Sequence, residues 1–224
     1  MKTETEKPNS PVRLPKRARE SSKRDYGRLL ILAGSRGYTG APSFASRAAV
    51  RGGAGLVWLG VPESIYAVTA VKNDEAMPFP LPCDAQGRLT AEALPEVEAR
   101  LERMSCLAIG PGLGRSAGVT EFVQGALAAS RVPTVVDADA LWALSRDMSS
   151  LEDAACPLVL TPHEGEFAML GGLLDGDRVA SARRFASRWG CTLVLKGSGS
   201  VVAFPDGECY VNQTGNPGMA RGGS

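Results

Sequence analysis

The chain repeats one pattern: a short, continuous apolar run ends in a glycine-rich or polar turn, and a helical segment follows. Residues 28–33 form the first such run, and residues 34–40 form its turn. A continuous apolar run is typical of a strand buried on both faces, as in a parallel sheet. Strands that alternate with helices indicate βαβ units. The pattern predicts a three-layer α/β fold with a mostly parallel sheet and helices on both faces.

The predicted elements share this alternation along the chain. The predicted strands are residues 28–33, 55–61, 107–109, 133–137, 158–161 and 192–196, with a hairpin at 200–204 and 208–211. The predicted helices are residues 41–51, a short helix after Pro62, 94–104, 116–130, 138–146 and 178–189. In the helix at 41–51, Phe44, Ala48 and Ala49 share an apolar face. Residues 70–90 are predicted to be loop-like, because three prolines interrupt any regular helix.

Composition narrows the functional class. Lys and Arg total 25 against 24 for Asp and Glu, so we expect no polyanion partner and no nucleic acid. No apolar run is long enough to span a membrane, and the polar N-terminus lacks a signal-peptide core. The five cysteines are widely spaced without a CxxC pair. They favour reduced thiols in a cytoplasmic protein over a zinc site or a disulfide framework.

Residues 1–26 differ from the remainder, because they combine three prolines and many cations with few apolar side chains. Such a segment buries too little surface to offset its ordering entropy, so we predict a disordered basic tail. A solvated tail is favoured over a role in nucleic-acid binding or localisation. The predicted folded domain is residues 27–224.

In parallel sheets, ligands bind beyond the carboxyl ends of the strands, where four of the predicted turns carry candidate chemistry. Residues 110–114, Gly-Pro-Gly-Leu-Gly, allow close backbone approach to a phosphate or ribose, although a tight turn without ligand explains them equally well. Asp137 and Asp139 stand at a strand end. Helix capping is favoured for one of them, and a water-mediated Mg²⁺ contact stays open for the other.

The remaining turns hold the single histidine and a lysine. His163 follows a strand beside Glu164 and Glu166, which either orient it or are first-turn acids favoured by the helix dipole. Residues 196–200, Lys-Gly-Ser-Gly-Ser, combine a cation with flexible backbone, which suits a nucleotide phosphate better than a plain hairpin turn. Residues 214–224 are glycine-rich and indicate either a phosphate-binding loop or a flexible tail.

Taken together, these fragments resemble the ADP/ATP-dependent NAD(P)H-hydrate dehydratases, which belong to the ribokinase-like superfamily. The resemblance covers about residues 27–224 and rests on six fragments in the family's order. They are Ala-Gly-Ser with Tyr-Thr-Gly-Ala (33–35, 38–41), Gly-Pro-Gly-Leu-Gly (110–114), Asp-Ala-Asp-Ala-Leu (137–141), Thr-Pro-His-Glu-Gly-Glu (161–166), Lys-Gly-Ser-Gly (196–199) and Thr-Gly-Asn-Pro-Gly-Met-Ala (214–220).

The resemblance implies an activity: ADP-dependent dehydration of the S epimer of hydrated NADH or NADPH, with release of AMP and phosphate. ADP (or ATP) would serve as co-substrate with Mg²⁺, and the ring hydroxyl would be phosphorylated before phosphate leaves. The family forms homo-oligomers, here expected to be tetramers. The implied substrate-binding residues are Ala41, Gly112, Gly114 and His163. The implied nucleotide-binding residues are Lys196, Gly197, Ser198, Gly199, Ser200 and Gly223.

One departure concerns the C-terminus. In this family the glycine-rich loop continues into Gly-Asp, where the aspartate acts as the base, whereas Ser224 is the last residue here. We therefore expect no catalytic residue and no metal ligand within the chain, and a domain that lacks its C-terminal helices. Two alternatives stay open: a ribokinase-like kinase of a small alcohol such as a vitamin precursor, and an inactive nucleotide-binding remnant.

Overall fold

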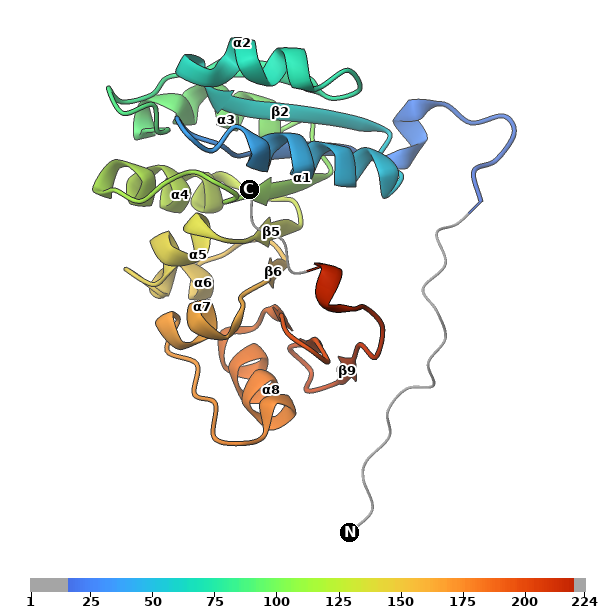
Figure 1. Ribbon diagram of the computed structural model, residues 1–224, viewed down its shortest axis with the longest axis vertical. Coiled ribbons are helices and arrows are strands. Elements are labelled where there is room, and N and C mark those ends of the chain that lie inside the picture. The colour runs from blue at the N-terminus through green and yellow to red at the C-terminus, as the bar shows by residue number, and fades with distance from the viewer. Residues whose placement is uncertain (1–15, 220–224) are drawn as a thin grey trace.

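The computed structural model describes residues 16–219, and its centre is a single sheet (Figure 1). The strand order is β3-β2-β1-β4-β5-β6-β7-β8-β9. Strands β1 to β7 are mutually parallel, and β8 and β9 continue the sheet as antiparallel strands. The strands are β1 (Arg28–Leu32), β2 (Leu56–Pro62), β3 (Met77–Leu81), β4 (Cys106–Ile109), β5 (Thr134–Val136), β6 (Leu158–Leu160), β7 (Thr192–Leu195), β8 (Val201–Ala203) and β9 (Cys209–Val211).

Helices lie on both faces of this sheet, which confirms the predicted fold class. The α-helices are α1 (Gly40–Arg51), α2 (Glu63–Lys72), α3 (Leu94–Leu101), α4 (Ala117–Ala129), α5 (Asp139–Leu144), α6 (Ser149–Glu152), α7 (Glu164–Met169) and α8 (Arg178–Trp189). Short 3-10 helices are η1 (Lys23–Tyr26), η2 (Ala91–Ala93) and η3 (Pro217–Met219). None of the helices between residues 16 and 219 is long and apolar enough to cross a membrane.

The two faces of the sheet carry separate cores. Helices α3 to α8 contribute to one large apolar cluster with side chains such as Leu32, Ile109 and Leu160. Helices α1 and α2 pack mainly on β1, β2 and β3, where Ile31 and Leu59 belong to a smaller cluster. Burial of these apolar side chains is the main force that stabilises the layers.

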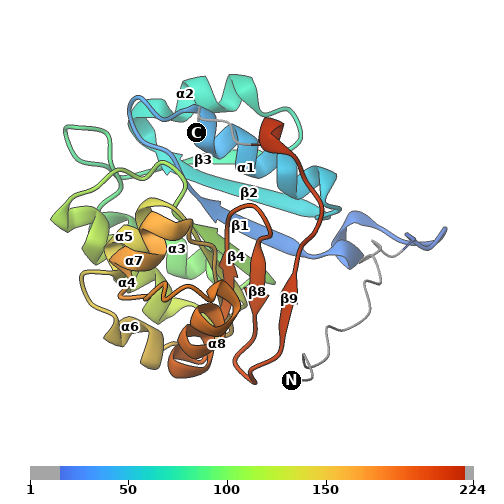
Figure 2. The ribbon, with the colours of Figure 1, turned by 60° about the horizontal axis from the view of Figure 1, so that its bottom comes forward.

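The face that α1 covers at β1 is left half-exposed farther along the sheet. Val135, Val159, Val194 and Val202 point to that side, and each is only partly buried. Among the described residues no helix packs on this side of β5 to β9, and Figure 2 shows β8 and β9 without a helix across them. We call these four valines the open valine row.

The prediction that residues 70–90 form only loops is wrong. Met77–Leu81 forms strand β3, which pairs with β2 at the edge of the sheet. Proline has no N–H for a ladder hydrogen bond, but an edge strand needs only one side to pair, so Pro78 and Pro80 are tolerated there.

No residue range was predicted from the sequence for the short helices α6 and α7.

Helix α1 buries a different face from the predicted one. Phe44 is 56% exposed, whereas Ser43 and Ser46 are buried. The Asn73 amide accepts a hydrogen bond from the Ser46 hydroxyl and donates one to Ser43, so polar partners decide which side of α1 faces α2. A satisfied polar contact carries little burial cost, which the apolar pattern alone does not register.

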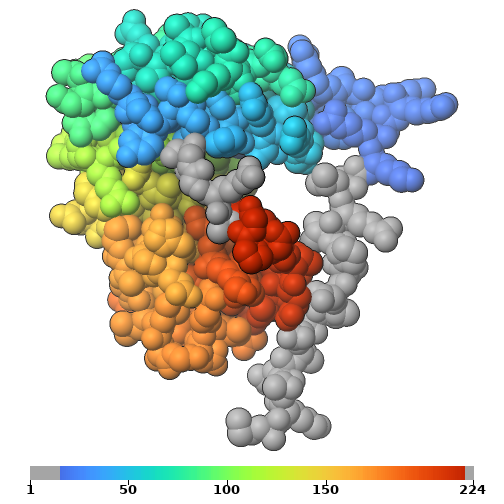
Figure 3. Space-filling model, in the orientation of Figure 1, coloured from blue at the N-terminus to red at the C-terminus, as the bar shows by residue number. Residues whose placement is uncertain are grey.

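The described part of the N-terminal segment is more structured than predicted. Lys23–Tyr26 forms η1, closed by a capping box between Ser22 and Asp25. The carbonyl of Tyr26 accepts a hydrogen bond from the Gly55 N–H at 2.9 Å. This N-terminal segment, in blue, projects from one side of the molecule in Figure 3. The prediction of disorder for residues 1–15 falls outside the described residues.

Candidate functional site

The carboxyl ends of the parallel strands bring the predicted turns to one edge of the sheet. After β1, the Gly34 N–H donates to the Pro111 carbonyl at 2.8 Å. The buried Ser35 hydroxyl donates to the Gly112 carbonyl, also at 2.8 Å. These bonds hold the first turn against the Gly-Pro-Gly-Leu-Gly turn that follows β4.

Ala41 and Gly112, both predicted substrate-binding residues, lie in contact. Gly112 has a φ of 70°, and a Cβ added to it would lie 2.9 Å from the Ala41 Cβ and 3.0 Å from the Tyr38 Cβ. Only glycine fits this approach. Ala41 is fully buried at the start of α1, so neither its backbone nor its side chain is exposed to a ligand in this structure. Thr39 provides no side-chain cap for this helix, and Pro42 in its first turn has no N–H to donate.

The acids after β5 do not cap helix α5. Its N-cap is Ala138, and Asp139 accepts a hydrogen bond from the Gly114 N–H at 2.9 Å and pairs with Arg115 at 3.0 Å. Asp137 instead pairs with Lys196, with 2.8 Å between Oδ1 and Nζ. The prediction of capping is therefore wrong, because both carboxylates reach stronger donors on neighbouring turns.

Ala138 sits between these two acids in an unusual conformation. Its φ is 52° and its ψ is −122°, and it is the one non-glycine residue with positive φ in the described chain. The turn is also crowded, because a Cβ on Gly110 would lie 1.7 Å from the Asp137 carbonyl oxygen. Backbone strain of this kind is kept where the surroundings enforce it, often at a functional site.

Lys196 lies among carboxylates instead of standing as a lone cation. Its Nζ is also 3.7 Å from the Glu166 Oε2, and the Glu166 side chain is only 10% exposed. The chain at Lys196 runs beside His163 through a parallel backbone bridge. Because β6 and β7 are neighbours, the histidine and lysine turns form one surface.

His163 is the N-cap of α7. Its Nδ1 accepts a hydrogen bond from the backbone N–H of Glu166 at 3.2 Å, and the backbone N–H of His163 donates to the Glu166 carboxylate at 2.9 Å. The Nδ1 atom must be unprotonated to accept this bond, so a neutral imidazole carries its proton on Nε2. Glu166 thus orients the histidine and also belongs to the first turn of the helix. The His163 side chain is 61% exposed, which leaves the ring accessible to a ligand.

Arg178 is a residue of this edge that the sequence analysis missed. It is the first residue of α8, and its guanidinium donates to the carbonyls of Lys196 and Ser198. An arginine at a helix start carries no sequence signal for such a contact, because the two carbonyls lie 18 and 20 residues away. The Lys196–Ser200 turn therefore has a basic support behind it. Gly223, the last predicted nucleotide-binding residue, lies outside the described residues.

The edge suits a magnesium ion that arrives with phosphates. No group of three His, Cys, Asp or Glu side chains that could hold a metal ion occurs within residues 16–219. Mg²⁺ commonly binds through one or two carboxylates together with phosphate oxygens and water. Asp137 and Glu166, which flank Lys196, are such carboxylates. Asp139 is already held by Gly114 and Arg115.

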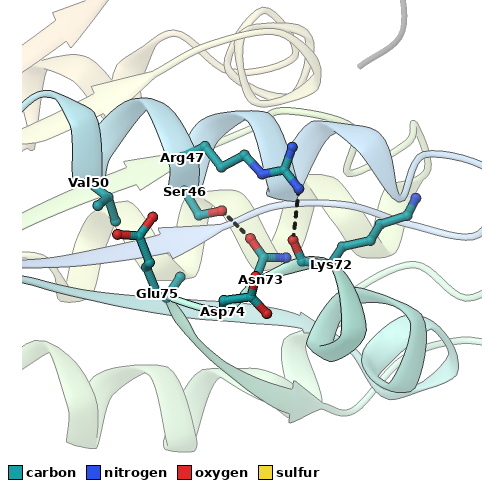
Figure 4. Close-up of a pocket in the computed structure, with 8 residues that line it drawn as sticks. Ser46, Arg47, Val50, Lys72, Asn73, Asp74 and Glu75 are labelled. Atoms are coloured by element: carbon teal, nitrogen blue, oxygen red, sulfur yellow. Dashed lines mark hydrogen bonds between the residues drawn. The ribbon is translucent and has the colours of Figure 1, made fainter.

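A cavity of about 170 Å³ lies elsewhere, between α1 and the segment that connects α2 to β3 (Figure 4). Arg47 donates to the Lys72 carbonyl at 3.1 Å across it. The buried Asn73 amide is fully engaged, since it accepts from Ser46 and donates to the Thr69 carbonyl at 2.7 Å. These contacts tie two helices together and leave the carboxyl edge as the candidate site.

Comparisons with known proteins identify the family of the chain. Residues 29–224 match the protein family described as NAD(P)H-hydrate dehydratase. The chain is 45% identical over 215 residues to the bifunctional NAD(P)H-hydrate repair enzyme Nnr of Moorella thermoacetica, across 94% of this chain but 41% of that protein. It is 36% identical over 216 residues to the ADP-dependent (S)-NAD(P)H-hydrate dehydratase of Bacillus subtilis, across 94% of this chain and 72% of that protein.

A solved structure supports the same relationship. The ADP/ATP-dependent NAD(P)H-hydrate dehydratase of Bacillus subtilis, co-crystallised with ATP and Mg²⁺, superposes with a TM-score of 0.78 at 33% sequence identity. That superposition covers 94% of this chain and 72% of the other. The six fragments, the shared fold and the family match agree, and the chain belongs to the NAD(P)H-hydrate dehydratase family.

Proposed function

We propose that this chain carries the dehydratase activity of its family: ADP-dependent conversion of (S)-hydrated NADH or NADPH back to NADH or NADPH. The ring hydroxyl oxygen takes the β-phosphoryl group of ADP, and AMP leaves. The phosphate ester then loses phosphate as the ring nitrogen supplies its electron pair, and loss of a ring proton restores the double bond. ATP is the alternative phosphoryl donor.

The observation that carries this proposal is the turn after β5. It sends Asp139 toward the Gly114 turn and Asp137 toward Lys196, so one short segment joins two potential subsites. We assign Ala41, Gly112 and Gly114 together with His163 to the hydrated dinucleotide. We assign the Lys196–Ser200 turn to ADP. Phosphoryl transfer depends chiefly on holding two reactants side by side and on offsetting phosphate charge, which this layout allows.

Magnesium belongs to the same proposal. Bound with ADP, the ion would offset phosphate charge, and Asp137 and Glu166 are the side chains we expect to hold it. Lys196 is within ion-pair distance of both carboxylates. Nucleotide binding would therefore exchange some of these ion pairs for contacts with Mg²⁺ and phosphate.

We further propose a homo-oligomer that works in the cytoplasm. All five cysteines are free thiols in the structure, which suits a reducing compartment. The half-exposed open valine row gives a subunit apolar surface to bury. Light scattering after gel filtration would measure the assembly, and a monomeric mass at physiological concentration would contradict it.

The test of the activity is direct. Purified protein is mixed with hydrated NADPH and ADP, and the reappearance of reduced nicotinamide is followed by its near-ultraviolet absorbance, with AMP and phosphate measured in parallel. One AMP and one phosphate per NADPH supports the proposal. A stable phosphorylated alcohol formed from ATP would indicate a kinase instead. ADP binding without turnover would indicate a nucleotide-binding remnant.

A further inference from the structure

The Arg178 side chain sits behind the Lys196–Ser200 turn. Its Nη2 donates to the Lys196 carbonyl at 3.1 Å, and its Nη1 donates to the Ser198 carbonyl at 3.0 Å. Its Nε lies 3.5 Å from Glu164 Oε1, on the residue after His163. Only 29% of the side chain is exposed. One planar guanidinium thus grips two alternate carbonyls of a single turn, which a flexible ammonium does not reproduce.

This grip sets the direction of the amide groups. In a trans peptide the C=O and the following N–H point in opposite directions. Because the carbonyls of Lys196 and Ser198 face Arg178, the N–H groups of Gly197 and Gly199 face away from it. The Gly197 N–H is held by the Ser200 hydroxyl at 3.3 Å. The Gly199 N–H meets no acceptor among residues 16–219. An unpartnered N–H in the same turn as Lys196 favours an anion on that side of the turn.

Gly197 allows the guanidinium to come this close. A Cβ placed on Gly197 would lie 2.5 Å from the Arg178 Nη2, so any larger residue would push the arginine away. The fit between this glycine and Arg178 indicates that the contact is specific and not an incidental surface pairing.

We infer that Arg178 is a positioning residue for the nucleotide turn: it holds the Lys196–Ser200 backbone so that the turn presents its N–H groups and Lys196 to the phosphates. This inference rests on the proposed function for the identity of the anion. Glu164 forms an ion pair with Arg178 at 3.5 Å and adjoins His163, so this ion pair links the two proposed subsites. Arg178 itself acts through the turn and not on the phosphate.

Three variants separate this role from its alternatives. Arg178→Ala removes the grip. Arg178→Lys keeps the charge but cannot bridge both carbonyls. Arg184→Ala is the matched control on the same helix, because Arg184 pairs with Asp175 at 2.6 Å on the exposed surface and donates no hydrogen bond to the Lys196–Ser200 turn. Amide hydrogen exchange of residues 197–200 is measured without ligand, and the Kd for ADP is measured by calorimetry.

Arg178→Ala should speed exchange at residues 197–200 and weaken ADP binding by about tenfold or more, since two hydrogen bonds from a charged donor are lost. Arg178→Lys should recover only part of the ADP affinity, and Arg184→Ala should match the wild type. Full recovery by Arg178→Lys would mean that charge alone matters and would overturn the inference. Unchanged exchange in Arg178→Ala would overturn it as well.

The two proposals fail in different ways. If the wild-type protein binds no ADP while Arg178→Ala still accelerates exchange at the turn, the proposed function fails and the positioning role stands. If Arg178→Ala does not fold, Glu164→Gln replaces it, because this change weakens the support of Arg178 at an exposed carboxylate. It should accelerate exchange at the same amides by a smaller factor, and no acceleration would overturn the inference.

Discussion

Ala138 shows how a single residue can carry the geometry of a site. With positive φ and a ψ of −122°, it turns the chain so that Asp137 and Asp139 diverge toward Lys196 and Gly114. Glycine adopts this conformation without steric cost, and alanine does not. The strain is supported by the two ion-paired carboxylates on either side, so the residue type and its neighbours act together.

Ala138→Gly should therefore stabilise the fold by about 1 kcal/mol, because relief of about 2 kcal/mol of backbone strain exceeds the added chain entropy of glycine, about 1 kcal/mol. Urea unfolding measures the difference. The matched control is Ala140→Gly, two residues later inside α5, which should destabilise by about 1 kcal/mol because helical geometry favours alanine there. Destabilisation by both changes would show that Ala138 is not strained in solution.

His163 has a structural role and a proposed ligand-binding role, which one substitution can separate. His163→Asn keeps an N-cap acceptor for α7, so stability should stay within about 0.5 kcal/mol of the wild type, whereas His163→Ala should lose about 1 kcal/mol. Both variants lack the imidazole. Both should therefore weaken hydrated NADPH more than ADP, and Lys196→Ala should show the reverse order. Calorimetric Kd values for both ligands decide this, and equal losses for both ligands in His163→Asn would contradict the role of the ring.

At the scale of elements, each strand ends where the apolar run gives way to glycine or polar residues. The junctions between helices and strands hold hydrogen bonds, ion pairs and buried side chains. Cys191 lies at the junction of α8 and β7 and is 1% exposed. Burial raises the pKa of its thiol to about 12, because the thiolate would lose its hydration there. The cysteine is therefore inert while these two elements stay packed.

We expect Cys191 to resist iodoacetamide in the native protein, while the partly exposed Cys83 and Cys209 react. Mass spectrometry of peptides after alkylation, with and without denaturant, measures this difference.

Burial of Cys191 also makes stability depend on pH, because the unfolded thiol ionises above its ordinary pKa of 9.0 and the folded thiol only near a pKa of about 12. Stability from this group should be intact below pH 9 and fall as the pH rises from 9 toward 12. Native alkylation of Cys191 at neutral pH would refute its burial.

At the scale of the whole molecule, the sheet is asymmetric. One face of β4 to β8 packs against α3 to α8, and the opposite face of β5 to β8 carries the open valine row. Parallel sheets usually have both faces covered, but one face of this sheet is left open. Adjacent residues of one strand point to opposite faces, so they should contribute very differently to stability. Strand β7 contains both kinds, with Leu193 fully buried and Val194 partly exposed.

Leu193→Ala should destabilise the fold by about 2–5 kcal/mol, because it removes buried atoms and leaves a cavity. Val194→Ala, one residue away, should cost less, about 1 kcal/mol, since its side chain is partly exposed and its removal leaves no enclosed cavity. Urea unfolding of both variants gives the comparison. If Val194→Ala proves as costly as Leu193→Ala, the open valine row is covered in solution.

The alternating elements and the family were accessible from the sequence by itself. Apolar runs, glycines and prolines act on the nearest few residues, so β1, α8 and the hairpin of β8 and β9 were predicted close to their observed bounds. The six fragments are also short local patterns, so their order along the chain was enough to indicate the family. The loop prediction for β3 was wrong because the prolines of this strand are tolerated at the edge of the sheet.

The pairing of side chains was decided by the tertiary structure. Asp137 and Lys196 are 59 residues apart, and Asp139 and Gly114 are 25 apart. Their contacts depend on which strand ends become neighbours and on the strained turn at Ala138. Arg178 reaches the Lys196–Ser200 turn only because α8 packs beside β7 and β8. Hydrogen bonds and ion pairs act over a few ångströms, so which groups meet is a property of the folded chain and not of its local pattern.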